Sequence, residues 1–258
     1  MKLKKSTLFF YSLAEMPINI ALFPILVFIP KFYTGEMGVP LALAANIILA
    51  VRIFDVFTDP VVGYINDRTN TKWGRRRPWI AIATPLLMVS IYMLFIPPEG
   101  AGALHLFLWM FLLSIATTML IIPYYAWGAE LSPDYNERSR ITGWRSISGV
   151  VGSLSAQLIP TIALVFFGLG GSTNVLYIVG IASVIIMPIC VFLTVSKVPE
   201  SKDYIKSNIS PIKGFKIMLE NSPFKRLIMA FMFGGIAFSI TIPLYLFFIT
   251  YVLKAEEM

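Results

Sequence analysis

Long apolar stretches, separated by polar connections, make up most of this chain. Seven stretches are long enough to cross the hydrocarbon core of a bilayer as a helix, which takes about 20 residues. They cover residues 6–31, 41–65, 78–97, 103–128, 142–167, 174–196 and 226–252. The pattern therefore predicts seven transmembrane helices, the first of which is too long for a cleaved signal peptide.

The composition leads to the same class of protein. Hydrophobic residues account for 57% of the 258 positions and charged residues for 14%, with a mean hydropathy of +0.77. A soluble domain could not bury this much apolar surface. We expect an all-α, integral multi-pass membrane protein in contact with the lipid bilayer.

The net charge of +7 is distributed unevenly. Lys and Arg are concentrated in the N-terminus and in alternate connections, and the intervening connections nearly lack them. By the positive-inside rule, the N-terminus and the basic connections are cytoplasmic. This distribution argues against a nucleic-acid partner. The basic connections are Asp67–Arg77, Glu130–Arg145 and Lys197–Arg226.

The chain has little that could support enzymatic chemistry. Cys190 is the single cysteine and His105 the single histidine, which excludes a disulfide framework and a cysteine- or histidine-rich metal site. No Ser/His set is present, and two aspartates on one helix do not face each other as an intramembrane hydrolase dyad must. We expect no enzyme activity and no cofactor.

Three charged residues in the second predicted span share one helical face. Arg52, Asp55 and Asp59 fall at i, i+3 and i+7. A charged side chain at bilayer depth costs a few kcal/mol, so these side chains must face protein, an ion or water.

Asp55 and Asp59 are the candidate cation-binding residues. At i and i+4 their Cβ atoms lie about 6 Å apart, so two anions would repel unless a proton or a cation joins them. The hydroxyls of Thr58 and Thr118 could add oxygen ligands for a monovalent cation. The residues leave H⁺ and Na⁺ open. The alternative is a static network in which Arg52 neutralises Asp55.

A basic loop follows the second span. We interpret its residues either as a gating clamp on neighbouring helices or as topology determinants that contact anionic lipid. The candidate gating residues are Gly63, Asp67, Arg68, Gly74, Arg75 and Arg76.

The order of spans is that of a major-facilitator transporter that is incomplete at residue 258. Residues 1–196 would form an N-terminal six-helix bundle, 197–225 a cytoplasmic loop, and 226–258 the first helix of a second bundle. A complete fold would need about five more helices. We expect the chain to be truncated and its partner to be the missing C-terminal bundle.

The stretch RIFDVFTDPVVGYINDRTNTKWGRRRPW, residues 52–79, closely resembles the glycoside–pentoside–hexuronide:cation symporter family, the melibiose-permease-like branch of the major facilitator superfamily. The D-x-x-x-D-P-x-x-G-x-x-x-D-R run is its most specific part. Further likeness lies in YSLAE at 11–15, FYT at 32–34, IPYY at 122–125 and the segment 130–145.

The resemblance implies roles for individual residues. Asp55 and Asp59 match the cation-binding aspartates of the family, Thr58 a cation-tuning position, and Thr118 a threonine near the cation. Glu15, Tyr125 and Arg145 match substrate-binding positions. Each of these residues has an alternative role. Glu15 could form a structural ion pair, Tyr125 could serve only in packing, and Arg145 could snorkel to lipid headgroups.

One position departs from the family pattern. Ile121 replaces a polar sugar-contacting residue and cannot accept a hydrogen bond. The cation pair is therefore retained, and the substrate site is altered.

The leading hypothesis is a symporter, coupled to Na⁺ or H⁺, for a small organic solute such as a sugar or glycoside. The alternatives are a symporter of a non-sugar, lysolipid-like substrate and a non-transporting structural or regulatory membrane subunit. The family implies a location in the bacterial plasma (inner) membrane.

Overall fold

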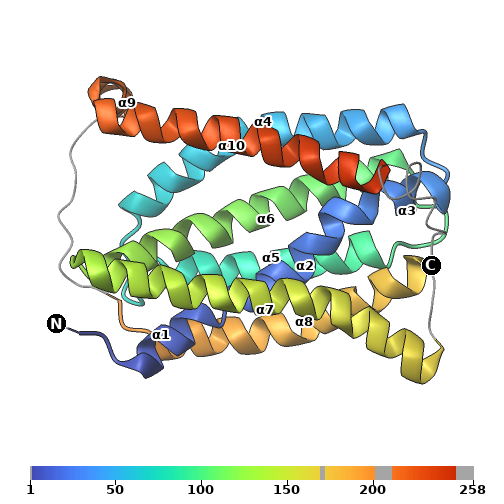
Figure 1. Cartoon of the computed structure of the whole chain (residues 1–258), viewed down its shortest axis with the longest axis horizontal. Coiled ribbons are helices and arrows are strands. Elements are labelled where there is room, and N and C mark those ends of the chain that lie inside the picture. Colours follow the sequence, from blue (N-terminus) through green and yellow to red (C-terminus); the bar gives the residue numbers. More distant parts are fainter. Residues whose placement is uncertain (1, 169–171, 201–210, 248–258) are drawn as a thin grey trace. The chain divides into compact units, whose positions relative to one another are not determined.

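The computed structural model describes residues 2–168, 172–200 and 211–247, and their regular structure is helical apart from one antiparallel bridge between Thr71 and Gly74 (Figure 1). The predicted all-α fold class is confirmed. The chain divides into two compact units, Met1–Tyr204 and Ile205–Met258. The first unit contains α1 (Lys5–Ser12), α2 (Glu15–Val27), α3 (Ile29–Gly35), α4 (Leu41–Arg68), α5 (Arg77–Phe95), α6 (Ala103–Glu130), α7 (Tyr135–Phe167) and α8 (Ser172–Lys197).

Within the described residues, six helical segments are long and apolar enough to cross a membrane. They correspond to the first six predicted spans. The first of them, Lys5–Gly35, is made of α1, α2 and α3. In the second unit, α9 (Pro211–Glu220) precedes α10 (Ser222–Phe247). Asn221 caps α10, because its side chain accepts a hydrogen bond from the Phe224 amide at 3.2 Å. Residues 248–252 of the predicted seventh span lie outside the described residues.

Proline explains the interruption in the first crossing. Pro17 has no amide hydrogen, and its ring would clash with the carbonyl of Leu13 in a continuous helix. Accordingly α1 ends at Ser12 and α2 begins at Glu15. A side chain from a neighbouring helix contacts a carbonyl beside this break: Thr194 Oγ1 of α8 donates to the carbonyl of Phe10 at 2.7 Å.

The fifth crossing begins earlier than the sequence pattern predicted. The expected start was residue 142, whereas α7 starts at Tyr135. Asp134 caps this helix, because its side chain accepts a hydrogen bond from the Glu137 amide at 2.9 Å. The first two turns of α7 carry charged residues, which hide the helix from a hydropathy pattern.

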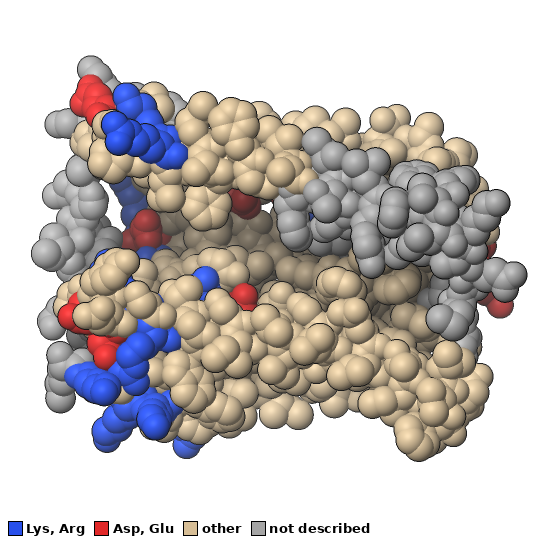
Figure 2. Space-filling view, in the orientation of Figure 1, with Lys and Arg blue, Asp and Glu red and all other residues tan. Residues whose placement is uncertain are grey.

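Basic side chains of the first unit gather at one end. Figure 2 shows this concentration at the end where α1 and α7 begin. The loop between α4 and α5 lies at the same end, as an even number of crossings requires. That this end faces the cytoplasm is the prediction of the positive-inside rule.

Small residues bring α7 close to α2. A Cβ atom added to Gly152 would overlap the carbonyl oxygen of Met16 and would lie 3.1 Å from Asn19 Cβ. At Gly149 an added Cβ would lie 3.3 Å from Glu15 Cγ. Glycine in α7 therefore permits the backbone approach that positions Glu15 beside this helix.

Gly152→Ala should lower the thermal stability of the intact gene product in detergent, because overpacking at such a contact costs about 1–3 kcal/mol. Gly143→Ala is the matched control on the same helix, since nothing lies within 4 Å of an added Cβ there. It should be neutral or stabilising by up to about 1 kcal/mol. Equal melting temperatures for the two variants would contradict this packing.

Candidate functional site

Asp55 and Asp59 face a cavity between α4 and α6. Its volume is about 240 Å³. Residues of α2, α4 and α6 line it, and they combine apolar side chains with carboxyl, hydroxyl and guanidinium groups. The lining residues are Leu22, Ile25, Val51, Arg52, Asp55, Asp59, Met110, Leu113, Ser114, Thr117, Thr118, Ile121 and Ile122.

Two hydroxyls of α6 pair with the two aspartates of α4. Ser114 Oγ donates to Asp55 Oδ1, and Thr118 Oγ1 donates to Asp59 Oδ1 at 2.7 Å. In each of the two pairs, donor and acceptor are 59 positions apart in sequence, so the i, i+4 spacing of the aspartates on α4 matches that of the hydroxyls on α6. Each carboxylate is thus oriented by a hydroxyl whose oxygen retains lone pairs for a cation.

Arg52 compensates one of the two carboxylates. Its Nη1 lies 3.3 Å from Asp55 Oδ2, and the exposed fractions of the two side chains are 57% and 19%. With both aspartates ionised, the three side chains carry a net charge of −1. This charge matches one monovalent cation.

Thr117 is a functional candidate that the sequence analysis missed. Thr117 lines the same cavity, and its hydroxyl oxygen is buried with no hydrogen-bond partner among the described residues. A buried hydroxyl without a partner costs about 1–3 kcal/mol, so such a group calls for a ligand. Ser114 was missed as well. The hydroxyl cluster S-x-x-T-T at 114–118 was the available signal.

The structure does not bring Thr58 into the cavity. Its hydroxyl donates to backbone carbonyls of its own helix, those of Phe54 at 3.3 Å and Asp55 at 3.4 Å. Thr58 is also not among the lining residues. One position along a helix turns a side chain by about 100°, and this separates Thr58 from Asp59.

The three predicted substrate residues come together from three helices. Tyr125 Oη of α6 donates to Glu15 Oε1 of α2 at 3.1 Å. Arg145 of α7 places its Nε 3.9 Å from Glu15 Oε2 and its Cζ 3.8 Å from the centre of the Tyr125 ring. Glu15 is only 8% exposed, whereas Tyr125 is 38% exposed. We refer to these residues as the solute trio.

A polar groove adjoins the trio on the α7 side. It has a volume of about 370 Å³. The groove is lined by Glu15, Asn19, Ser146, Gly149, Val150, Ser153 and Leu154. Carboxyl, amide and hydroxyl groups therefore meet where the buried Glu15 becomes accessible. Ile121, in contrast, lines the cation cavity and adds only apolar surface.

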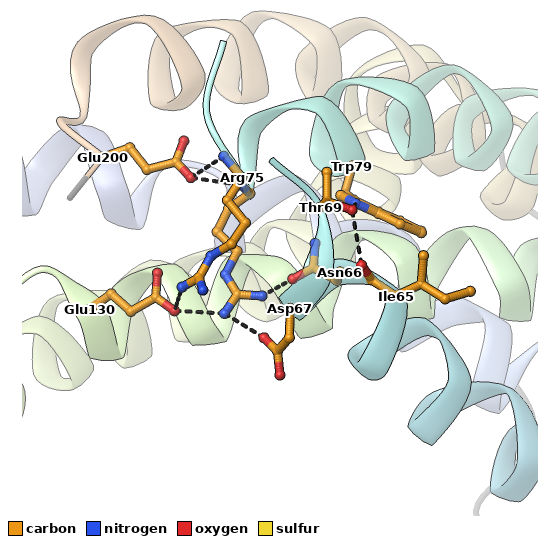
Figure 3. Close-up of polar contacts among 9 residues, drawn as sticks. Ile65, Asn66, Asp67, Thr69, Arg75, Trp79, Glu130 and Glu200 are labelled. Carbon is orange, nitrogen blue, oxygen red and sulfur yellow. Dashed lines mark hydrogen bonds and ion pairs between the residues drawn. The ribbon is translucent and has the colours of Figure 1, made fainter. Parts of the chain in front are cut away.

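Three of the six predicted gating residues, Asp67, Arg75 and Arg76, form one charge network (Figure 3). The guanidinium of Arg76 donates to Asn66 Oδ1, lies 2.8 Å from Asp67 Oδ1 and 2.6 Å from Glu130 Oε1. Arg75 Nη2 pairs with the same Glu130 oxygen. Burial lowers the pKa of Arg76, but hydrogen bonds and charge from Glu130 and Asp67 outweigh it and leave the pKa raised.

The loop itself is fixed by a residue that the sequence analysis did not identify. Glu200 Oε1 accepts hydrogen bonds from the backbone amides of Arg75 at 2.6 Å and Arg76 at 2.7 Å. Gly74 has φ 122°, and an added Cβ there would overlap the Glu200 carboxylate. Only glycine suits that position.

Two predicted gating residues lie outside this network. Arg68 is exposed and lies over the ring of Tyr64, 4.1 Å from its centre. At Gly63 an added Cβ would make an ordinary contact of 3.8 Å with Ile122, so no close helix approach depends on this glycine.

The sequence profile of the family described as MFS/sugar transport protein matches residues 10–258. The chain belongs to this family. It is 28% identical to the isoprimeverose transporter of Lactiplantibacillus pentosus over 83% of this chain and 46% of that protein. It is 29% identical to a glucuronide carrier protein homolog of Escherichia coli over 54% of this chain and 31% of that protein.

A further relative is the sodium-dependent lysophosphatidylcholine symporter 1 of Mus musculus, 27% identical over 88% of this chain and 49% of that protein. The chain spans about half the length, or less, of these curated relatives. The family is therefore one of transporters, and its named members include symporters of sugars and of a lysolipid. The glycoside–pentoside–hexuronide resemblance is confirmed.

Arg76→Ala should lower the thermal stability of the intact gene product by about 2 kcal/mol or more, because the charge-assisted hydrogen bonds of a buried guanidinium are lost. Arg68→Ala is the control from the same loop, and its effect should stay within about 0.5 kcal/mol. Thermal unfolding in detergent measures both variants. A loss as large for Arg68→Ala as for Arg76→Ala would refute the assigned network.

Proposed function

We propose that this chain belongs to a symporter in which one monovalent cation, held by Asp55 and Asp59, drives the uptake of a small hydroxyl-bearing solute. The observation that carries the proposal is the cavity with two carboxylates and only one compensating arginine. A net charge of −1 at bilayer depth favours cation binding, because an uncompensated charge is costly there. We place the protein in the plasma membrane with its N-terminus in the cytoplasm.

Na⁺ is the coupling ion that this site suits best. A proton needs only a carboxylate, whereas hard cations prefer several oxygen ligands. Ser114, Thr117 and Thr118 of α6 line the same cavity as the aspartates of α4 and could supply three hydroxyl oxygens. The unpartnered Thr117 hydroxyl would be satisfied by Na⁺ and gains nothing from a proton on Asp59.

The solute trio supports a neutral solute that is rich in hydroxyl groups. Glu15 and Arg145 have opposite charges, so together they favour no net charge on the ligand. Their donors and acceptors, with those of Asn19 and Ser146 in the adjoining groove, suit the hydroxyls of a sugar or glycoside. The named transporters of isoprimeverose and glucuronides add support from similarity.

A lysophospholipid is the second candidate solute. The opposite charges of Glu15 and Arg145 would also suit a zwitterionic headgroup. The mouse lysophosphatidylcholine symporter makes this class relevant. Binding assays with isoprimeverose and with lysophosphatidylcholine distinguish the two.

Coupling would act through α6, which contributes to both sites. Thr118 and Tyr125 both belong to α6; Thr118 contacts Asp59 of α4, and Tyr125 contacts Glu15 of α2. Thr118 and Tyr125 are seven positions apart, which corresponds to about 10 Å along the helix. Cation binding would fix the α4–α6 contact and so favour the arrangement of α6 that binds the solute, in the sense of a coupling free energy between two sites.

Asp59→Asn should abolish Na⁺-driven accumulation of the solute in vesicles that contain the intact gene product, because cation affinity should fall about 100-fold. Glu99→Gln, which removes a carboxylate from a loop outside the cavity, is the control and should accumulate solute normally. Accumulation by Asp59→Asn under a Na⁺ or pH gradient at the wild-type level would exclude the proposed mechanism.

Thr117→Val keeps the shape of the side chain and removes the hydroxyl. We expect a Na⁺ affinity about three- to tenfold weaker, as the loss of one oxygen contact implies. Thr84→Val is the matched control, since the Thr84 hydroxyl bonds the Ile80 carbonyl within α5 at 2.7 Å. Binding of ²²Na⁺ to the purified protein measures both, and equal affinities would remove Thr117 from the site.

Glu15→Gln should weaken solute binding about tenfold and leave ²²Na⁺ affinity within twofold of wild type, because a charge-assisted contact is worth about 1.5–3 kcal/mol. Glu36→Gln removes an exposed carboxylate near the end of the first crossing and serves as control. Isoprimeverose binding at wild-type affinity in Glu15→Gln would show that the trio does not bind this sugar.

A further inference from the structure

Tyr11 of α1 and Tyr124 of α6 form a reciprocal pair of hydrogen bonds. Tyr11 Oη donates to the Tyr124 carbonyl at 3.0 Å, and Tyr124 Oη donates to the Tyr11 carbonyl at 2.7 Å. Their rings stack with centroids 4.7 Å apart, and neither residue has exposed surface. Each side chain thus binds the other residue's backbone, which fixes both the separation and the register of the two helices.

This pair lies one helical turn from the solute trio. Tyr11 precedes Glu15 by four residues, and Tyr124 is adjacent to Tyr125. The Tyr11–Tyr124 contact and the Tyr125–Glu15 hydrogen bond, 3.1 Å long, are therefore successive links between the same two segments of chain.

The helix break at Leu13–Ala14 lies between these two links. Leu13 and Ala14 keep right-handed helical dihedrals, but the helical hydrogen bonding is interrupted there, so contacts on either side help to fix the position of Glu15. On the α1 side, the Tyr124 hydroxyl donates a hydrogen bond to the Tyr11 carbonyl, and the Thr194 hydroxyl donates one to the Phe10 carbonyl. The end of α1 is thereby fixed to α6 and α8.

α6 leaves room for this pair. An added Cβ at Gly128 would overlap the hydroxyl of Tyr11, so Tyr11 lies directly against the α6 backbone one turn beyond Tyr124. A larger residue at 128 would displace the Tyr11 ring. The absence of a side chain at Gly128 thus leaves space for the Tyr11 hydroxyl, which donates to the Tyr124 carbonyl.

We infer that the Tyr11–Tyr124 pair is a positioning device that holds the Glu15 carboxylate against Tyr125 across the break in the first crossing. Neither tyrosine lines the cation cavity or the polar groove. Tyr11 also interacts directly with Arg145 of the solute trio, so the pair contacts the trio at Arg145 as well as positioning Glu15. The importance of the Glu15 position for solute binding rests on the proposed function. The claim that the tyrosine pair sets this position is independent of the proposed function.

Another buried tyrosine provides a matched control. Tyr33 Oη donates to the Leu94 carbonyl at 3.3 Å, between α3 and α5, and Tyr33 also has no exposed surface. Tyr124→Phe and Tyr33→Phe each remove one buried hydroxyl that binds a backbone carbonyl of another helix. Both should lower thermal stability to a similar extent, so stability alone does not identify a positioning role.

The test is the accessibility of Glu15 to dicyclohexylcarbodiimide, a reagent for protonated carboxyl groups in apolar surroundings. The intact gene product is labelled in membranes without Na⁺, and peptide mass spectrometry compares Glu15 with Asp59 as the internal reference. Tyr124→Phe should raise the Glu15-to-Asp59 labelling ratio about fivefold, the equivalent of one hydrogen bond. Tyr125→Phe, which removes the hydrogen bond to Glu15 itself, sets the upper limit of the effect.

Tyr33→Phe should leave this ratio at the wild-type value. The same ratio in Tyr124→Phe as in Tyr33→Phe would overturn the positioning role. Isoprimeverose binding separates this inference from the proposed function. If Tyr124→Phe changes the labelling ratio but Glu15→Gln binds isoprimeverose normally, the pair positions Glu15 and the assignment of the solute site fails.

Discussion

The cost of an uncompensated charge in an apolar layer governs the arrangement of this bundle. α4 carries Arg52, Asp55 and Asp59 within three turns, and the residues around them are suited to lipid or protein contact. The structure turns this stripe toward α6, where Ser114 and Thr118 bind the carboxylates. Arg52 compensates one of them, and the proposed cation would compensate the charge that is left over.

The same helix that receives these carboxylates also carries Tyr124 and Tyr125. Under the proposed function, an ion bound between α4 and α6 would therefore act on the helix that contacts both Glu15 and the end of α1. At the basic end of the bundle, Arg76 and Glu200 hold the α4–α5 loop to α6 and to the chain after α8. The aspartate–hydroxyl contacts and the Arg76 network thus both link α4, or the loop after it, to α6.

The sequence was sufficient for features that depend on composition and local spacing. The six crossings, the shared face of Asp55 and Asp59, and the residues of the solute trio were predicted from hydropathy, helical periodicity and family resemblance. Thr118 was also placed near Asp59 before the structure was known. These features depend on residues whose type or spacing alone is informative.

The remaining features depend on which helix faces meet. Thr58 lies beside Asp59 in sequence but bonds its own helix, and the hydroxyls of Ser114 and Thr117 needed the packing of α4 on α6 to become relevant. Glu200 binds amides more than 120 residues away, which no local pattern can reveal. The start of α7 was predicted late because a capped, charged helix end lacks a hydropathy signal.

The stoichiometry of Na⁺ binding tests the central claim most directly. Equilibrium binding of ²²Na⁺ to the purified intact gene product should show one saturable site per chain. This result follows if Arg52 compensates one of the two carboxylates. Two Na⁺ ions per chain would show that Arg52 does not do so. The absence of saturable binding at every pH would contradict the assignment of the cavity as a cation site.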